Sequence, residues 1–176
     1  MNLKDIEDLA EELVKKYNPT VIVPFPFKKI LEDKSDLRIF ESEKLGEDVS
    51  GAISYLTDKK IYVILINAHK TVSRKYFTTA HEIGHYFLHK ELISKSEILV
   101  DNDPNVDNLS VLYLSDNPLN PSQTETEANR FAASLLMPKE WVIKAWNELK
   151  DVEDCAKVFN VSVSSMSIRL EKMKLL

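Results

Sequence analysis

The sequence contains a single cysteine, Cys155, among its 176 residues. One cysteine cannot form an intrachain disulfide, so we expect the fold to depend on its apolar core and the protein to reside in the cytoplasm. Long apolar runs are also missing. No stretch approaches the ~20 residues of a membrane span, and the polar N-terminus offers no apolar signal region. We therefore expect neither secretion nor a membrane anchor.

Positive charge is in short supply as well. The 23 lysines and arginines are outnumbered by 28 aspartates and glutamates, which leaves a formal net charge of −5. This balance gives no general support for binding to nucleic acid. Hydrophobic residues at 44% and charged residues at 29% are typical of a globular protein, and the length suits one domain with a sizeable core.

Histidine and glycine are scarce, with four and three copies, yet both occur in the segment His81-Glu82-Ile83-Gly84-His85. The surrounding apolar spacing predicts a helix, in which residues four apart share a face with Cβ atoms roughly 5–6 Å apart. Two imidazoles placed in this way can bind one zinc ion. Glu82 lies about 100° round the helix from His81. It can therefore reach a water on the metal without being a ligand.

A less specific interpretation of this segment is an amphipathic helix that happens to carry two histidines. Gly84 counts against it, because a glycine inside a helix costs roughly 1 kcal/mol relative to alanine. Close approach of another backbone or of substrate would explain the glycine, although helices also tolerate one without such a reason. We favour the metal site, which then needs a third protein ligand and one open position.

His89 is the nearest further histidine, but its position argues against a ligand role. It lies eight residues beyond His81, which is about 12 Å of helix rise. His81, His85 and His89 therefore cannot all bind one ion. We expect His89 to pack at the helix end or to interact with the C-terminal helix dipole.

The better third ligand is Glu125, in a segment whose apolar spacing predicts a helix over residues 124–137. Glu125 falls on the apolar face, and a buried carboxylate needs a partner that a metal would supply. Glu127 is rotated about 200° from Glu125 toward solvent, and it is the second choice. Asn129 shares the face of Glu125 and is placed to hydrogen-bond a ligating histidine.

Helix capping is the competing interpretation of these two glutamates. Ser122 lies three residues before Glu125, which is the spacing of a capping box. The same spacing relates Thr124 to Glu127. Capping would be the preferred reading if the segment stood alone, but beside the H-E-x-x-H segment we favour Glu125 as the ligand.

The remaining patterns predict both helices and strands. Residues 51–56 and 61–66 flank a polar turn, which predicts a β-hairpin, and the second strand is apolar nearly throughout, which predicts burial on both faces. Ser73 is the expected N-cap of the H-E-x-x-H helix, and residues 91–123 are expected to form a long irregular excursion beside the site. Helices are predicted at 3–17, 27–31, 74–90, 124–137, 140–149, 152–159 and 163–172, and an extended segment at 37–40.

Two blocks of the sequence resemble the signature of the ImmA/IrrE family of zinc metallopeptidases. The first runs from Phe77-Thr78-Thr79-Ala80 through the H-E-x-x-H segment to Phe87-Leu88-His89. The second is Glu125-x-Glu127-Ala128-Asn129-x-Phe131-Ala132-Ala133-x-Leu135-Leu136-Met137-Pro138. The order of the preceding elements is similar too. The resemblance covers most of the chain from Ile6 to Leu176 and is weakest across 91–123.

The resemblance implies an α+β fold of the zincin-like, gluzincin type, with a small antiparallel-containing sheet in a single domain. Residues 1–138 would form the metallopeptidase domain, and residues 139–176 a C-terminal helical extension packed on it. The family also implies Zn²⁺ bound by the two histidines and a glutamate of the second helix, with Glu82 as the catalytic carboxylate. In this sequence those ligands are His81, His85 and Glu125.

The resemblance also implies a function. Characterised members of the family act on helix-turn-helix repressors, often encoded beside them on mobile elements or in stress-response loci. This chain is therefore expected to be a cytoplasmic, regulatory metalloendopeptidase, an anti-repressor that cleaves an Xre-like repressor encoded nearby. The residue that stabilises the oxyanion is left open among Tyr55, Arg74 and Tyr113.

The C-terminal segment supports a rival function. Residues 152–159 and 163–172 predict two helices around a tight turn, as in a helix-turn-helix. Basic residues near the second helix are few, namely Arg169, Lys172 and Lys174, so we expect packing or partner binding rather than direct DNA binding. The alternative function is a DNA- or protein-binding regulator with a structural or vestigial zinc site, although a structural site has no need of Glu82.

One further motif is interpreted as a solvated loop. Asp101-x-Asp103-x-Asn105-x-Asp107 begins like a calcium-binding loop. However, Val106 stands where glycine is needed, and Leu112 stands where a bidentate glutamate is needed. We therefore expect no calcium site.

Overall fold

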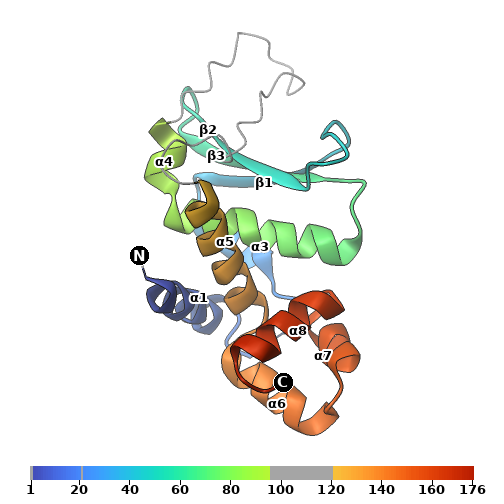
Figure 1. Cartoon of the computed structure of the whole chain (residues 1–176). Helices are drawn as coiled ribbons and strands as arrows, with labels where there is room; N and C mark the ends of the chain where they lie inside the picture. The colour runs from blue at the N-terminus through green and yellow to red at the C-terminus, as the bar shows by residue number, and fades with distance from the viewer. Residues whose placement is uncertain (1, 21, 96–120) are drawn as a thin grey trace.

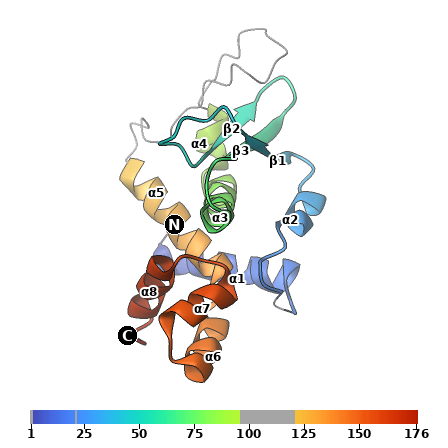
Figure 2. The same cartoon turned by 90° about the vertical axis from the view of Figure 1, so that its right-hand side faces the viewer.

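The computed structural model describes residues 2–20, 22–95 and 121–176. These residues form eight helices and a three-stranded sheet, which confirms the predicted α+β class. The elements lie in layers (Figure 1, Figure 2). The sheet covers one side of α3 (Val72–Leu88), while α1 (Leu3–Tyr17) and α5 (Pro121–Leu136) lie on the opposite side.

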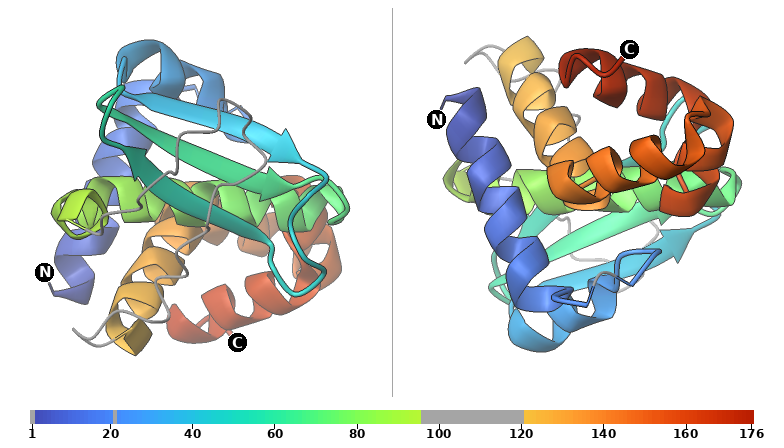
Figure 3. Two further views of the ribbon diagram at one scale, coloured as in Figure 1. Left: turned by 90° about the horizontal axis from the view of Figure 1, so that it is seen from above. Right: turned by 90° about the horizontal axis from the view of Figure 1, so that it is seen from below.

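The sheet is built around its most apolar strand. The strand β3 (Ile61–Asn67) lies in the centre, parallel to β1 (Leu37–Ser42) and antiparallel to β2 (Gly51–Leu56). The predicted hairpin of β2 and β3 is confirmed. Residues 62–66 are all buried, as expected of a strand covered on both faces. Figure 3 shows the sheet lying over α3 when the molecule is viewed from above.

The N-terminal helix begins and ends as its sequence predicts. Asn2 caps α1 by accepting hydrogen bonds from the amides of Lys4 and Asp5, and the helix ends at Tyr17. Its apolar stripe is buried and packs on α5. A short helix, α2 (Phe27–Asp33), follows and leads into β1.

The helix α3 starts two residues earlier than predicted. Thr71, not Ser73, is its N-cap, and the Thr71 hydroxyl accepts a hydrogen bond from the amide of Arg74 at 3.3 Å. The prediction was wrong because either hydroxyl can cap, and the sequence does not show which one leaves the helix. The second half of α3 is buried around most of its circumference, as expected for a helix between two layers.

The prediction of a long irregular segment at 91–123 is wrong at both ends, because each end is helical. Residues 90–95 form a short helix, α4 (Lys90–Lys95), with Ile93 buried. At the other end α5 already begins at Pro121, a residue whose fixed φ suits the first helical turn. Ser122 and Thr124 therefore lie inside α5 rather than at its N-cap, so the capping-box interpretation is also wrong. The calcium-like segment 101–112 lies outside the described residues.

Three helices complete the chain, namely α6 (Lys139–Leu149), α7 (Val152–Phe159) and α8 (Val163–Lys172). Their bounds match the prediction to within one residue. Asp151 and Ser162 cap α7 and α8 with their side chains, and Asn160 makes the tight turn between them with a φ of 52°.

Arg169 joins α8 to the rest of the protein. It is only 4% exposed, and its Nε donates to the carbonyl oxygen of Met137 at 3.1 Å. Its Nη1 lies 3.6 Å from a carboxylate oxygen of Glu7 in α1. The view from below in Figure 3 shows α8 beside α5. The division of the chain at residue 138 stays a prediction. Within the described residues, no helix combines the length and apolarity needed to cross a membrane.

Candidate metal centre

The site depends on how closely α3 and α5 approach each other. Gly84 lies at their crossing, where a Cβ would meet Phe131 Cδ1 at 3.0 Å and the carbonyl oxygen of Ala128 at 3.3 Å. A side chain at this position would push the two helices apart. The glycine therefore allows α5 to lie against α3, as the sequence suggested, and this contact brings Glu125 to the H-E-x-x-H segment.

The structure brings the three predicted ligands together. His81 Nε2 and His85 Nε2 lie 3.0 Å apart. The two carboxylate oxygens of Glu125 divide between them, Oε2 lying 3.2 Å from His81 Nε2 and Oε1 lying 3.2 Å from His85 Nε2. Among the described residues, these three side chains form the group of histidine, cysteine and acidic residues whose donor atoms could hold one metal ion.

The two glutamates of α5 differ from their predicted exposure. The side chain of Glu125, expected to face the core, is 42% exposed and opens on a cleft. Glu127, expected to face solvent, is buried, and its Oε2 lies 2.9 Å from His89 Nε2. The prediction failed because helical rotation fixes the angle between two side chains but not which neighbouring helix each one meets.

The Nδ1 atom of each histidine in the cluster is hydrogen-bonded to a neighbouring side chain. Asn129 Oδ1 lies 3.0 Å from His81 Nδ1, the position predicted for it. His85 Nδ1 lies 2.9 Å from His89 Nδ1. These contacts leave the Nε2 atoms of His81 and His85 facing each other and Glu125. His89 does not join the cluster, in agreement with the helix-rise argument.

Two of the three side chains, His85 and Glu125, have protonation states that suit metal ligands. Burial lowers the pKa of His85 to about 4, so its imidazole is neutral near pH 7. Hydrogen bonds from His81 and His85 hold the pKa of Glu125 well below its usual range, so the carboxylate is ionised. Burial lowers the pKa of His81, but the hydrogen bond to Glu125 and the charges of Glu82 and Glu125 raise it by more. A cation close to Glu125 is therefore favoured.

Glu82 is buried beside the cluster but takes no part in it. Its side chain is 6% exposed, and burial raises its pKa to about 7. In the described part of the chain, no hydrogen bond or ion pair engages its carboxylate. Gly51 of β2 leaves room for it, because a Cβ on Gly51 would lie 3.3 Å from Glu82 Oε1 and 2.5 Å from Thr78 Cγ2.

The cluster and Glu82 open into a cleft of about 410 Å³. The start of β2 forms one wall, from Gly51 to Ile53, and α3 and α5 form the other. Arg74 lines this cleft and donates from Nε to Ser50 Oγ at 3.0 Å. Tyr55 instead packs its ring on Tyr62, at 4.7 Å between centroids. Tyr113 lies outside the described residues, so Arg74 is the oxyanion candidate that the structure places in the cleft.

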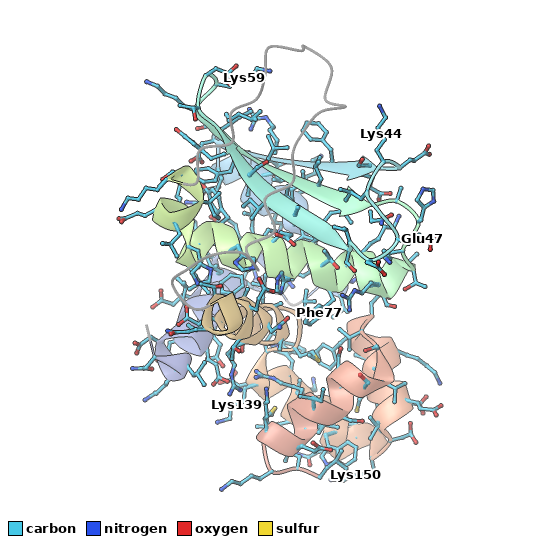
Figure 4. The ribbon with its side chains drawn as sticks, turned by 45° about the horizontal axis from the view of Figure 1, so that its top comes forward. Lys44, Glu47, Lys59, Phe77, Lys139 and Lys150 are labelled. Atoms are coloured by element: carbon cyan, nitrogen blue, oxygen red, sulfur yellow. The ribbon has the colours of Figure 1, made fainter. Side chains whose placement is uncertain are left out.

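A second cavity of about 400 Å³ lies between α5 and α8. Phe77 and Asn129 line both this cavity and the cleft. Figure 4 shows Phe77 on the side of α3 that faces the C-terminal helices. The second cavity is also lined by the half-exposed Ile168 and by Lys172 of α8.

Sequence reasoning missed the partners of His89 and the role of Gly51. The four-residue spacing of His85 and His89 was a usable signal, because it places two rings within reach on one helix face. The contact of His89 with Glu127 had no such signal, since it joins two helices. Gly51 could be recognised only as a glycine at the start of a strand.

Comparisons with known proteins identify a family and a fold. The model of the Peptidase_M78 family, described as the IrrE N-terminal-like domain, matches residues 32–171. No curated protein matches the sequence. Among solved structures, a Mycobacterium tuberculosis transcriptional regulator is similar with a TM-score of 0.64 at 17% identity, which indicates a shared fold. The similarity covers 95% of this chain but 47% of that one, so this chain spans about half the length of the regulator.

Proposed function

The chain belongs to the Peptidase_M78 (IrrE N-terminal-like) family, and from this premise we propose that it is a zinc-dependent metalloendopeptidase. One observation carries the proposal. The donor atoms of His81, His85 and Glu125 surround one point, next to a buried Glu82 carboxylate with no partner in the described part of the chain. A structural zinc site has no use for such a carboxylate, whereas hydrolysis needs a base.

The donor set fits zinc. Two imidazoles and one carboxylate are a common set in catalytic zinc sites, which keep a fourth position for water. Ligand atoms at 2.0–2.1 Å from a tetrahedral zinc lie about 3.3 Å from one another. The two histidine Nε2 atoms are 3.0 Å apart, and each lies 3.2 Å from a different carboxylate oxygen of Glu125. With one ligand atom taken from each residue, the three atoms lie within 4.8 Å of one another. The cleft leaves the fourth direction open to substrate.

Each residue then has a defined part in peptide hydrolysis. A zinc ion at the cluster would polarise the scissile carbonyl and make a water more acidic. Glu82 accepts the proton of the attacking water and passes it to the nitrogen of the leaving amine. Arg74 lines the same cleft and is the side chain we propose to stabilise the developing negative charge. Asn129 keeps His81 in the orientation that presents Nε2.

The strand β2 is the proposed platform for substrate. It lies at the edge of the sheet, and among the described residues no strand pairs with its outer side. An extended peptide segment can add to such an edge by backbone hydrogen bonds. Residues 51–53 of β2 line the cleft, so a segment bound there would pass the cluster. The neighbouring cavity at Phe77 offers a continuation toward α8.

We propose a cytoplasmic helix-turn-helix repressor of the Xre-like kind, encoded nearby, as the protein substrate. The family resemblance supports this substrate. A structural neighbour at the level of the fold is a transcriptional regulator, which is compatible with a regulatory setting. The lone Cys155 is buried and free, which suits the cytoplasm.

The rival function is a DNA- or protein-binding regulator with a structural or vestigial metal site. The helical pair α7 and α8 is its main support. Arg169, one of the few cations of α8, is buried against Met137 and is not available to a DNA backbone. The rival therefore has less support than the peptidase, at least for direct DNA binding.

The experiment that separates the two functions combines metal content with cleavage. Purified protein is assayed for bound zinc and incubated with the neighbouring repressor, with and without chelator. We expect one zinc per chain and chelator-sensitive cleavage. Glu82→Gln should retain zinc and lose cleavage by about 10²–10⁴-fold, the usual contribution of a general base. Full activity of that variant would exclude the role of Glu82, and zinc without cleavage would favour the regulator.

A further inference from the structure

The ring of His89 lies between a proposed metal ligand and a buried carboxylate. His89 Nδ1 is 2.9 Å from His85 Nδ1, and His89 Nε2 is 2.9 Å from Glu127 Oε2. On the far side of the carboxylate, Gln123 Nε2 donates to Glu127 Oε1 at 3.0 Å. His85, His89 and Glu127 are all buried. A connected row of hydrogen bonds therefore runs from the cluster into α5.

The position of every hydrogen in this row follows from one condition. If His85 offers the lone pair of Nε2 to a metal, its Nδ1 carries the hydrogen. That hydrogen is donated to His89 Nδ1, which must then be the acceptor. The hydrogen of neutral His89 lies on Nε2 and is donated to the Glu127 carboxylate. The row is fully satisfied with both rings neutral and one ionised carboxylate.

We propose that His89, held by Glu127, is a positioning residue that fixes the ring orientation and tautomer of the zinc ligand His85. The inference rests on the proposed zinc site and goes beyond it, since neither residue contacts the metal. Ligating histidines generally donate their second nitrogen to such a group, and losing it typically lowers metal affinity by about 10–100-fold. Here the carboxylate of Glu127 acts on His85 through a second histidine. His89 is hydrogen-bonded to both residues, and Glu127 itself does not reach His85.

The same helix positions both ligating histidines. Glu125 and Asn129, four residues apart, supply the third ligand and the contact to His81 Nδ1. Gln123 and Glu127, also four apart, supply the support for His89. Residues four apart share a helix face. One face of α5, with Glu125 and Asn129, thus contacts the metal cluster directly. A neighbouring face, with Gln123 and Glu127, supports the cluster through the hydrogen bond to His89.

The test measures zinc affinity by competition with a chromophoric chelator, using the full chain. His89→Phe keeps the ring volume but offers His85 no acceptor, and we expect it to weaken zinc binding by about 10–100-fold. His89→Asn provides an amide oxygen as an acceptor near His85 Nδ1 and should recover part of the loss. The matched control is His69→Phe, because His69 is exposed and, within the described residues, the hydrogen bond of its ring is to the carbonyl oxygen of Glu43.

Glu127→Gln provides a second route to the same answer. If the row acts as one unit, its effect on zinc affinity will not add to that of His89→Phe in the double variant. Additive effects would show that the two residues act separately and would overturn the relay. Thermal unfolding of the metal-free proteins shows which variants remain folded. If His89→Phe does not fold, His89→Asn replaces it in the double variant, and the zinc affinity of the single variants Glu127→Gln and His89→Asn can still be measured.

Nitrogen-15 spectra of the zinc-loaded protein report the tautomer of each histidine ring. A purely structural role of His89 would not determine these tautomers. We expect hydrogen on Nδ1 of His85 and on Nε2 of His89. The opposite tautomer on either ring would overturn the proposal, as would an unchanged zinc affinity in His89→Phe. In both cases the zinc site itself would stand. Failure of the unaltered protein to bind zinc would instead overturn the proposed function, and this inference with it.

Discussion

Gly84 of α3 faces the ring of Phe131 in α5, and a Cβ added to the glycine would lie 3.0 Å from Phe131 Cδ1. The next nearest atom, the carbonyl oxygen of Ala128 at 3.3 Å, belongs to the backbone of α5 and cannot rotate away. The distance between the two helices is therefore set at this glycine. Because Glu125 lies one turn before Ala128, the same contact sets how far the carboxylate stands from the histidines.

Gly84→Ala should weaken both the fold and the metal site. Overpacking a core typically costs about 1–3 kcal/mol, while alanine recovers roughly 1 kcal/mol of helix propensity. We expect a net loss of up to about 2 kcal/mol in the free energy of unfolding of the metal-free protein, measured with urea. Zinc affinity should fall as well, because moving α5 away from α3 moves Glu125 away from His81 and His85. Gly46→Ala is the control, since its Cβ would meet only Val49 Cγ2, at 4.0 Å. Equal behaviour of the two variants would contradict this view of the crossing.

Gly51→Ala should impair cleavage without removing zinc. The new Cβ would lie 2.5 Å from Thr78 Cγ2, 3.1 Å from the carbonyl oxygen of Leu65 and 3.3 Å from Glu82 Oε1, so the strand or these side chains must shift. A misplacement of about 1 Å can cost roughly 100-fold in rate, and we expect a loss of 10- to 100-fold in kcat with zinc affinity retained. Adding Thr78→Ser removes the nearest clashing atom and should restore part of the rate. A loss of zinc in Gly51→Ala would show that the strand supports the ligands rather than Glu82.

Local signals account for the parts of the fold that were predicted well. Apolar spacing predicted helices at 3–17, 152–159 and 163–172, and these boundaries were confirmed. The structure adds that Asn2, Asp151 and Ser162 cap the three helices. The burial of β3 followed from its composition. These features depend on neighbours in sequence, and a single chain displays them directly.

Contacts between distant segments account for what was missed. The parallel pairing of β1 with β3 has no local signature. The exposures of Glu125 and Glu127 were assigned in reverse, because they depend on the crossing of α5 over α3. His89 was assigned to the helix end, where it does lie, but its contact with Glu127 joins residues 38 positions apart. The identities of the clustered residues followed from motif spacing, and so did the contact of Asn129 with His81. The support of His85 by His89 did not.

Arg169→Met should destabilise the protein by disconnecting α8. The buried guanidinium donates to the Met137 carbonyl oxygen and lies near Glu7 and Ser134. Methionine preserves the apolar stem but leaves the carbonyl without its donor, which costs about 1–3 kcal/mol. We expect a loss of this size in urea unfolding, partly limited because Glu7 keeps Arg130 at 3.0 Å.

Lys172→Met is the matched control for Arg169→Met, since Lys172 is exposed on the same helix. It should change the free energy of unfolding by less than about 0.5 kcal/mol. If both variants proved neutral, α8 would not be held by Arg169. The outcome also bears on DNA binding, because an arginine needed for packing is not available to contact phosphates.

Glu82→Gln should stabilise the metal-free protein, and increasingly so as pH rises. Burial raises the pKa of Glu82 from 4.5 to about 7 in the folded state. A carboxyl group with a raised folded pKa contributes its full stability below the unfolded pKa and loses it as pH rises through the folded pKa. The protein with Glu82 should therefore lose stability between about pH 4.5 and pH 7 from this group. The loss is on the order of 2–3 kcal/mol.

Urea unfolding at pH 5 and pH 8 in the presence of chelator measures this difference. The neutral amide of the variant does not titrate, so the stability of Glu82→Gln relative to the unaltered protein should grow from pH 5 to pH 8. Glu125 has a lowered pKa and acts in the opposite direction, with stability lost as pH falls, but it is present in both proteins and largely cancels. Parallel pH profiles would show that the Glu82 carboxylate is solvated, and its role as a base poised near neutral pH would lose its physical basis.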